Sequence, residues 1–593
     1  MKKRNQINDK YKWDLTHIYD TEDKLMEDIE VLKTAAEKVA SYKGRLHKPN
    51  VCLEFFKYGT EIGKIEERLS VYLLLKLSED LSNTKYLELE SVVSAINKKI
   101  AYASSFEESE LLKCGEKYIK KLIKDPRFEL YRLSLDNFLR NKDHILTEKE
   151  EAILSKAGRA LGGYSDVFDN LDNLDLKFKD AFDSKGKPHE VNQHNYSELL
   201  ESTDRTLRKN AMISYNEGYH SVCNTISSNY ISSVEGDWFM ADVYRFNSVL
   251  ESSLFGGNIP KEVYTKLLEN VGNNVKHVHK FYALKKKALG YKDFYSYDRI
   301  VPITKNKQKY DYPTSCKHVL EAMSVLGEDY VKHLKEAMDN RWIDVYPCEK
   351  KESGGFCCSM YVPHPYILLN TVDDSRSIYT LAHELGHAMH GKLSAETQPF
   401  EHYDHTIFLA EIASTVNEVL LFKYLYKNSS NKNEKLAHLE KYISNIIGTI
   451  FTQTLYSEFE FYAHSLVEQG AAISKDLLNA KYKELIQKYH GKSVKSLPAE
   501  IGEGWMRIPH FYRPYYVYKY ATGMTSAINF ARRICEGEDG MVDRYLTFLK
   551  SGSIDYSVNI LKNAGIDLTE DAPYKVMNDE LTWALKEFES LLK

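Results

Sequence analysis

The sequence predicts a mainly α-helical protein with little β-structure. Apolar residues recur at helical spacing in many runs, including residues 62–77, 86–100, 147–161 and 261–275. Strand-like alternation is short, as at residues 174–178. A chain of 593 residues can bury several cores, so two or three packed subdomains are expected.

The first part of the chain contains two local signals. Thr147-Glu-Lys-Glu150 has the pattern of a capping box that opens a helix. Residues 174–178, followed by Ser184-Lys-Gly186-Lys, predict a strand, a turn and a small hairpin near 174–190. A boundary near Leu200 separates an N-terminal helical lobe, residues 1–200, from a region of residues 201–593. No Pro- or Ser-rich linker marks it, so the two parts are expected to pack together.

Composition excludes several classes of function. The net charge of −5 and the lack of a long basic block argue against a nucleic-acid partner. No apolar stretch is long enough for a membrane span, and the basic start has no apolar signal-peptide core. Eight cysteines without a C-x-x-C pair indicate free thiols in a reducing compartment, so we expect a cytoplasmic location.

The segment His383-Glu384-Leu-Gly-His387 contains the pattern His-Glu-x-x-His on a predicted helix. Residues four apart lie one turn apart on the same face, so His383 and His387 can bind one ion. Two imidazoles supply half of a tetrahedral zinc shell and leave Glu384 beside the metal to handle a proton. The pattern therefore predicts one Zn²⁺ per chain and a metallopeptidase, although manganese or cobalt could also occupy such a site.

A third ligand is needed, and a second apolar-periodic helix downstream supplies acidic residues. Glu411 is our choice because the chain can turn back by that point as an antiparallel helix. Glu396 and Glu401 fall in the connection, where the backbone is less fixed. Glu418 is on the same face as Glu411 and can accept a hydrogen bond from the outer nitrogen of a zinc histidine.

The sequence resembles the zinc oligopeptidases related to thimet oligopeptidase, and within them the bacterial oligoendopeptidase F group. Three motifs carry the resemblance: residues 383–390, Glu411-Ile-Ala-Ser, and the segment 507–523 with Arg507-Ile-Pro-His510-Phe-Tyr and Tyr515-Tyr-Val-Tyr-Lys-Tyr. The resemblance implies that His383, His387 and Glu411 bind zinc and that Glu384 is the catalytic base. It also implies two helical lobes around a deep substrate channel, with a small zincin-like β-sheet beside the zinc helix.

The tyrosine-rich motif is a candidate for stabilising the transition state. Peptide hydrolysis builds negative charge on the carbonyl oxygen, which a phenol or imidazole can stabilise. Tyr515 and Tyr518 share one helical face and Tyr516 and Tyr520 another, so spacing alone leaves both pairs open. The family pattern assigns the role to Tyr515 and Tyr518, together with His510.

A glycine-rich loop and a short strand precede the zinc helix, at residues 352–360 and 361–370. Two prolines suit an edge strand, which can hold a substrate backbone as an added strand. A buried structural strand is the alternative. The resemblance favours substrate contact through Gly354, Gly355 and Tyr366, with the glycines allowing close backbone approach.

Together these features predict an intracellular zinc oligoendopeptidase that hydrolyses internal bonds of short, unstructured peptides through a zinc-activated water, with Glu384 as general base and acid. No obligate protein partner is evident in the sequence. Two alternatives stay open: a helical zinc metallocarboxypeptidase, and a catalytically silent peptide-binding scaffold.

Overall fold

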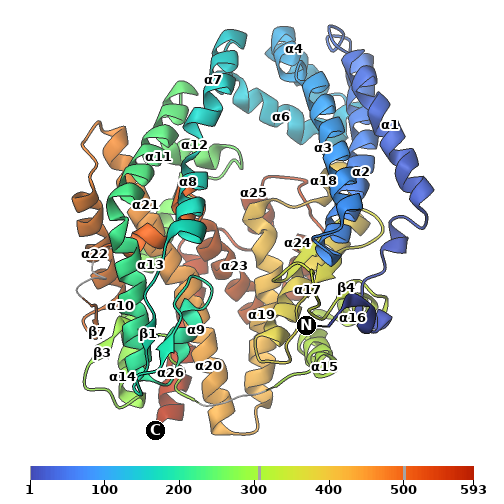
Figure 1. Ribbon diagram of the computed structural model, residues 1–593. Coiled ribbons are helices and arrows are strands. Elements are labelled where there is room, and N and C mark those ends of the chain that lie inside the picture. Colours follow the sequence, from blue (N-terminus) through green and yellow to red (C-terminus); the bar gives the residue numbers. More distant parts are fainter. Residues whose placement is uncertain (1, 305–308, 498–501) are drawn as a thin grey trace. The chain divides into compact units, whose positions relative to one another are not determined.

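The structure is a computed structural model that describes residues 2–304, 309–497 and 502–593. It confirms the mainly α-helical prediction (Figure 1). The chain forms two compact units, each built from three segments. The first unit consists of Met1–Asp143, Lys307–Tyr424 and Arg533–Gly565, and the second of His144–Asn306, Leu425–Arg532 and Ile566–Lys593. Leu200 lies inside the second unit. The boundary predicted near Leu200, between residues 1–200 and 201–593, stays a prediction.

The first unit contains most of the helices that come before and around the zinc motif. They are α1 (Glu22–Ala40), α2 (Pro49–Glu79), α3 (Thr84–Ser104), α4 (Glu107–Cys114), α5 (Glu116–Ile123), α6 (Arg132–Asn141), α15 (Tyr312–Met323), α16 (Glu328–Asp339), α17 (Ser377–Thr397), α18 (Phe400–Tyr403), α19 (Ile407–Asn428), α24 (Met541–Leu549) and α25 (Ser557–Asn563). Helices α1, α2 and α3 lie side by side (Figure 1). The last residues of α19 belong to the second unit.

The second unit is also helical. Its helices are α7 (Glu148–Leu161), α8 (Tyr164–Asn170), α9 (Tyr196–Glu201), α10 (Arg205–Ser221), α11 (Cys223–Val243), α12 (Val249–Phe255), α13 (Lys261–Gly272), α14 (Lys276–Ala288), α20 (Lys432–Ile446), α21 (Gln453–Glu468), α22 (Lys475–His490), α23 (Tyr518–Cys535) and α26 (Ala572–Leu592). The four predicted amphipathic runs fall in α2, α3, α7 and α13. The predicted capping box opens α7, where Thr147 and Glu150 cap each other's backbone N–H groups.

The strand predicted at residues 174–178 is wrong. Residues 171–175 form a turn of π-helix, and the ring of Phe178 stacks on Tyr215 of α10 with centroids 5.0 Å apart. Phe178 of this segment therefore packs on a helix instead of entering a sheet, while Leu174 is 64% exposed. The hairpin itself is present slightly further on, where β1 (Ala181–Phe182) pairs antiparallel with β2 (Pro188–His189).

A three-stranded sheet lies beside α17 in the first unit (Figure 1). Its strands are β4 (Ile343–Asp344), β5 (Phe356–Cys358) and β6 (Tyr366–Leu368), in the order β4-β6-β5. The sequence predicts that the strand within residues 361–370 forms the edge, and this is wrong because β6 is central and fully buried. The edge next to α17 is β5, which runs antiparallel to β6. The second unit adds a short parallel pair, β3 (Phe294–Tyr295) and β7 (Val494–Lys495).

One hydrophobic core supports the sheet. It runs from the N-terminal helices, with Leu32 of α1 and Leu73 of α2, through Trp13 to Tyr366 and Leu368 of β6. Each large apolar side chain that is buried in this way stabilises the folded state by roughly 1.5–3 kcal/mol. The sheet beside the zinc motif is therefore held by the N-terminal helices of the same unit.

Helices α17 and α19 touch at the level of their backbones. A β-carbon at Gly386 would lie 2.5 Å from Cα of Ser414 and 2.7 Å from the carbonyl oxygen of Ala413. Asn417 is fully buried and donates from its side-chain amide to the carbonyl of Ala382 at 3.0 Å. Only glycine permits this approach, which brings α19 against the face of α17 that carries the zinc motif.

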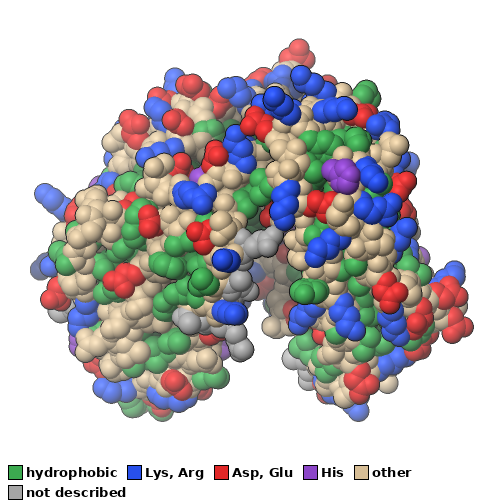
Figure 2. Space-filling view, turned by 90° about the horizontal axis from the view of Figure 1, so that it is seen from above, with side chains coloured by type: hydrophobic (Ala, Val, Ile, Leu, Met, Phe, Trp, Pro, Cys, Tyr) green, Lys and Arg blue, Asp and Glu red, His purple; other side chains and the backbone are tan. Residues whose placement is uncertain are grey.

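The surface carries both signs of charge. On the face in Figure 2, basic and acidic side chains are interspersed, in keeping with the net charge of −5. None of the helices in the described part of the chain has the length and apolar character that spanning a bilayer requires.

We predict that Gly386→Ala destabilises the protein by about 1–3 kcal/mol and weakens metal binding, because the added methyl group forces α17 and α19 apart. Thermal denaturation and metal analysis of the purified variant would measure both effects. Gly59→Ala is the matched control, since Gly59 lies in α2 and a β-carbon added there would have nothing within 4 Å. That substitution should stabilise the helix slightly. Equal behaviour of the two variants would contradict the packing argument.

Candidate metal centre

Three side chains of the first unit converge on one point. The Nε2 atoms of His383 and His387 are 3.2 Å apart, and Oε2 of Glu411 lies 3.4 Å and 3.5 Å from them. Ligands at about 2.0–2.2 Å from a tetrahedral zinc ion lie about 3.3–3.6 Å from one another. The donor set and its spacing therefore fit Zn²⁺.

Glu418 orients one of these histidines. Its Oε1 is 2.6 Å from Nδ1 of His383, the contact expected from the sequence. When Nδ1–H donates to this carboxylate, Nε2 is the ring nitrogen that is left to bind a metal ion. Burial lowers the pKa of His383, but hydrogen bonds to Glu411 and Glu418 outweigh it and raise that pKa to about 10. The hydrogen bonds with His383 and His387 hold the pKa of Glu411 well below its usual range.

Glu384 is buried beside the two histidines, with 6% of its surface exposed, and burial raises its pKa. Its Oε1 lies 3.7 Å from the position of a β-carbon at Gly355. The same β-carbon would lie 3.2 Å from the methyl group of Thr380. Gly355 thus brings the loop before β5 close to the carboxylate, and Gly354 next to it has a φ of +86°, which suits glycine.

His390, the third histidine of the motif segment, is not one of the three converging residues. It is fully buried, and its ring stacks on His405 with centroids 3.8 Å apart. The ring of Phe548 also packs against His390, with centroids 5.3 Å apart. His390 therefore packs against His405 and Phe548 in the interior of the first unit.

Tyr366, predicted to contact substrate, is fully buried in β6. Its hydroxyl donates to the carbonyl of Asp14 at 3.1 Å. The strand β6 is paired on both sides, and the side chain of Tyr366 is part of the core. Tyr366 is therefore not retained as a substrate-binding candidate. Gly354 and Gly355 precede the edge strand β5 and remain candidates.

In the second unit, His510 groups with two partly exposed tyrosines. The hydroxyl of Tyr520 is 3.4 Å from Nε2 of His510. The rings of His510 and Tyr516 are nearly parallel at 6.1 Å, and Tyr516 meets Tyr520 edge-on at 5.5 Å. These two tyrosines are the pair with four-residue spacing, which the sequence leaves open as the alternative.

Tyr515 and Tyr518, the pair favoured by the family pattern, are each only 1% exposed. Both rings pack against Tyr264, at 5.4 Å. Tyr515 has a left-handed backbone with a φ of +53°, and α23 begins only at Tyr518. The segment is not a regular helix there, so helical spacing does not put these two side chains on one functional face. Their predicted catalytic roles stay predictions.

A buried acidic group holds the left-handed turn. Oε1 of Glu460 accepts the backbone N–H of Tyr515 at 2.6 Å. The ring of His464 is tilted by 37° against that of Tyr515, with centroids 5.1 Å apart, and its Nε2 is hydrogen-bonded to Oδ2 of Asp237 at 3.1 Å. Burial raises the pKa of Glu460 to about 8. The sequence does not predict this role for Glu460, because it comes 55 residues before its partner and no local pattern links them.

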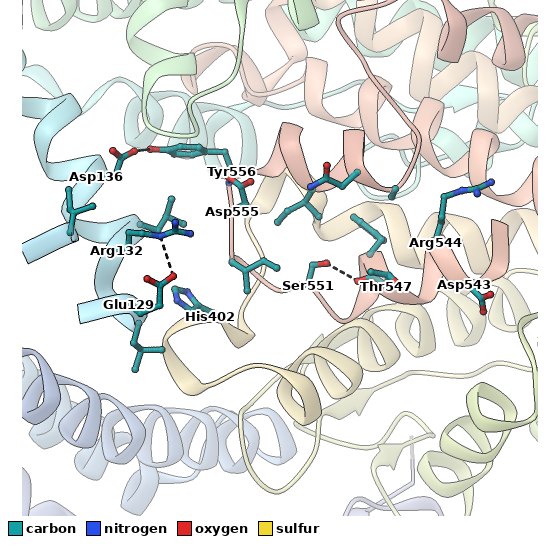
Figure 3. A pocket seen from close by; sticks show the side chains of 18 residues that line it. Glu129, Arg132, Asp136, His402, Asp543, Arg544, Thr547, Ser551, Asp555 and Tyr556 are labelled. Atoms are coloured by element: carbon teal, nitrogen blue, oxygen red, sulfur yellow. Dashed lines mark hydrogen bonds and ion pairs between the residues drawn. The ribbon is translucent and has the colours of Figure 1, made fainter. Parts of the chain in front are cut away.

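The first unit also contains a cavity of about 1030 Å³, lined by the 3₁₀-helix Pro126–Tyr131, α6, α24 and α25 (Figure 3). Among the described residues that line it, none is a predicted site residue. Several of its polar side chains pair with one another. Nε of Arg132 lies 3.5 Å from Oε1 of Glu129, and the hydroxyl of Tyr556 donates to Oδ2 of Asp136 at 2.9 Å. The candidate site is therefore defined by the convergent donor atoms and not by this cavity.

Comparisons with known proteins give the family of the chain. Residues 198–579 match peptidase family M3, and residues 110–178 match Oligopeptidase F. The Oligoendopeptidase F homolog of Borreliella burgdorferi is 34% identical over 576 residues, which cover 96% of each chain. Oligopeptidase PepF of Bacillus subtilis is 32% identical over 100% of this chain and 89% of its own. A crystal structure of a putative peptidase from Chlamydophila abortus has a TM-score of 0.95 at 31% identity and covers 100% of both chains.

The helical fold and these matches define the chain as a peptidase. It belongs to peptidase family M3. The resemblance to the oligoendopeptidase F group inferred from the three motifs is thereby confirmed.

We predict a pH-dependent effect of Glu460→Gln on stability. With a folded pKa of about 8 against an ordinary value of 4.5, folding favours the protonated carboxyl. That stabilisation is complete below pH about 4.5 and is lost as pH rises through about 8. An amide cannot ionise, so the variant should gain stability relative to wild type between pH 5 and 9 in urea unfolding. Glu484→Gln, whose parent side chain is 65% exposed, is the control and should show no such trend. A flat difference for Glu460→Gln would exclude a buried, protonated Glu460.

Proposed function

We propose that the chain is a zinc metalloendopeptidase that hydrolyses internal bonds of short, unstructured peptides. The observation that carries the proposal is the convergence of His383 Nε2, His387 Nε2 and Glu411 Oε2 at tetrahedral spacing, with the buried Glu384 carboxylate beside them. Family M3 membership supports the peptidase part, and the names of the relatives support oligopeptides as substrates and internal cleavage. We infer a cytoplasmic location from the sequence alone.

The three ligands would hold Zn²⁺, which when bound supplies Lewis acidity toward a peptide carbonyl and lowers the pKa of a water molecule. Glu384 then accepts a proton from the attacking water and returns it to the nitrogen of the departing amine. Glu418 keeps His383 in the tautomer whose Nε2 is free to act as a ligand. The chain's own contribution is thus a fixed ligand geometry and one carboxylate that transfers protons.

We assign oxyanion stabilisation to His510 with Tyr516 and Tyr520. These three side chains contact one another and are partly exposed. A hydrogen-bond donor must be exposed in this way to reach a substrate oxygen. Tyr515 and Tyr518 are buried against Tyr264, which supports a packing role for them.

We assign backbone binding of the peptide to the edge of β5. This strand ends the sheet next to α17, and Gly355 before it approaches Glu384 without a side chain in the way. An edge strand offers unpaired backbone groups to an extended peptide, which positions the scissile bond without reading much side-chain sequence.

We expect the enzyme to cut end-blocked peptides internally, to be inactive with a chelator and to recover with added Zn²⁺. Glu384→Gln should retain zinc and lose turnover by a factor of about 10²–10⁴. Glu396→Gln, on the same helix, is the control and should behave as wild type. Mass spectrometry of peptides of graded length, alongside a folded protein, provides the readout.

Other outcomes of this experiment would support the alternatives. Removal of residues only from free C-termini would identify a metallocarboxypeptidase. No cleavage by a folded, zinc-loaded chain would identify a peptide-binding scaffold. An undiminished zinc content in Glu411→Ala would show that the third ligand is another residue.

For the oxyanion donors, we expect Tyr516→Phe or Tyr520→Phe to lower kcat by about 10²-fold with a smaller change in KM. Tyr515→Phe and Tyr518→Phe should leave kcat near wild type, because their rings keep the same packing. Steady-state kinetics of the four variants on one internally quenched peptide would measure this. The reverse ranking would restore the family-based assignment to Tyr515 and Tyr518.

A further inference from the structure

A second group of potential ligands lies in the second unit. Ligand atoms of His220, Cys223 and Glu503 all lie within 4.8 Å of one another. Nδ1 of His220 is 2.8 Å from Oε2 of Glu503. We propose that these three residues form a separate binding site for a thiophilic divalent cation, with Zn²⁺ as the natural ion. The site goes beyond the proposed peptidase function and shares no residue with it.

The break between two helices creates the site. Helix α10 ends at Ser221 and α11 starts at Cys223, with Val222 between them in a non-helical conformation. His220 and Cys223 lie on either side of this break, three residues apart, and their ligand atoms converge. Glu503 comes from a remote part of the chain, directly before the 3₁₀-helix Gly504–Arg507.

The chemistry of the three donors suits zinc. Imidazole, thiolate and carboxylate are its usual protein ligands, and a thiolate selects it over hard cations such as Mg²⁺. Cys223 is only 7% exposed, whereas the His220 side chain is 65% exposed. The sulfur is therefore shielded, while the open side lets an ion enter and a water complete a tetrahedral shell.

Lys475 opposes binding at this site. Its Nζ is 3.7 Å from Sγ of Cys223 and 2.7 Å from Oδ1 of Asn224. The ammonium group stands near the sulfur, where it repels an incoming cation. When an ion binds the sulfur, the ammonium group of Lys475 can keep its hydrogen bond to Asn224. We therefore expect weaker binding here than at the His383 site.

Occupancy would tie two distant segments together. The ion would join the α10–α11 junction to Glu503, seven residues before His510 in the chain. An ion that binds only the folded protein stabilises it by mass action. The site is thus a metal staple for the segment that leads to His510.

The test is a Cd²⁺ titration of the chelator-stripped chain in a phosphine reductant, read by calorimetry and by cadmium–thiolate charge-transfer absorbance. We expect two ions per chain and a thiolate absorbance that saturates with one of them, since the His383 group contains no cysteine. Cys223→Ser should bind one ion and lose the absorbance. Cys535→Ser, which removes an exposed cysteine that is in no disulfide, is the matched control and should behave as wild type.

Two further variants keep the test decisive if Cys223→Ser folds poorly. His220→Gln changes an exposed side chain and should weaken the second ion about tenfold or more. Lys475→Met should strengthen it, because the variant lacks the positive charge that repels the incoming cation. One ion per chain, absorbance that survives Cys223→Ser, or a second affinity unchanged in His220→Gln would each overturn the proposal and identify His220–Glu503 as an ordinary ion pair. The absorbance is independent of peptide cleavage, so this failure is distinct from failure of the proposed function.

Discussion

The candidate metal centre depends on the backbone contact between α17 and α19 at Gly386. A helix can place His383 and His387 one turn apart by itself, but the third donor must come from another element. With any larger residue at position 386, Ser414 would have to move by more than a small adjustment, and Glu411, on the same helix, would move with it. The ligand spacing of 3.2–3.5 Å is therefore a consequence of helix packing as much as of ligand identity.

Charge and burial then set the properties of this centre. Two carboxylates, Glu411 and Glu418, contact His383 from opposite ring nitrogens, so one fixes the ring while the other completes the donor set. Glu384 lies beside the same histidines, but among the described residues it has no hydrogen bond to either of them. Burial raises the pKa of Glu384, whereas hydrogen bonds with the histidines lower the pKa of Glu411. Similar side chains are thereby separated into a ligand, an orienting group and a proton carrier by their surroundings alone.

In the second unit, a buried polar cluster determines which tyrosines face outward. Glu460 fixes the left-handed turn at Tyr515, which lies in the irregular segment before α23 begins at Tyr518. A left-handed residue cannot be part of a right-handed helix, so helical spacing counted from Tyr515 does not hold. As a result Tyr516 and Tyr520 adjoin His510, while Tyr515 is packed into the interior.

The sequence by itself determined the helical class, the family, and the residues that converge at the metal centre, because these depend on helical periodicity and on short motifs such as residues 383–387. Only the tertiary structure decided that β5 and not β6 forms the sheet edge, since strand order depends on pairing between distant segments. It also decided the orientation of the tyrosines, because the conformation of Tyr515 is imposed by a carboxylate 55 residues away. Local spacing carries information about one element, whereas burial, strand order and left-handed turns depend on contacts that no single segment contains.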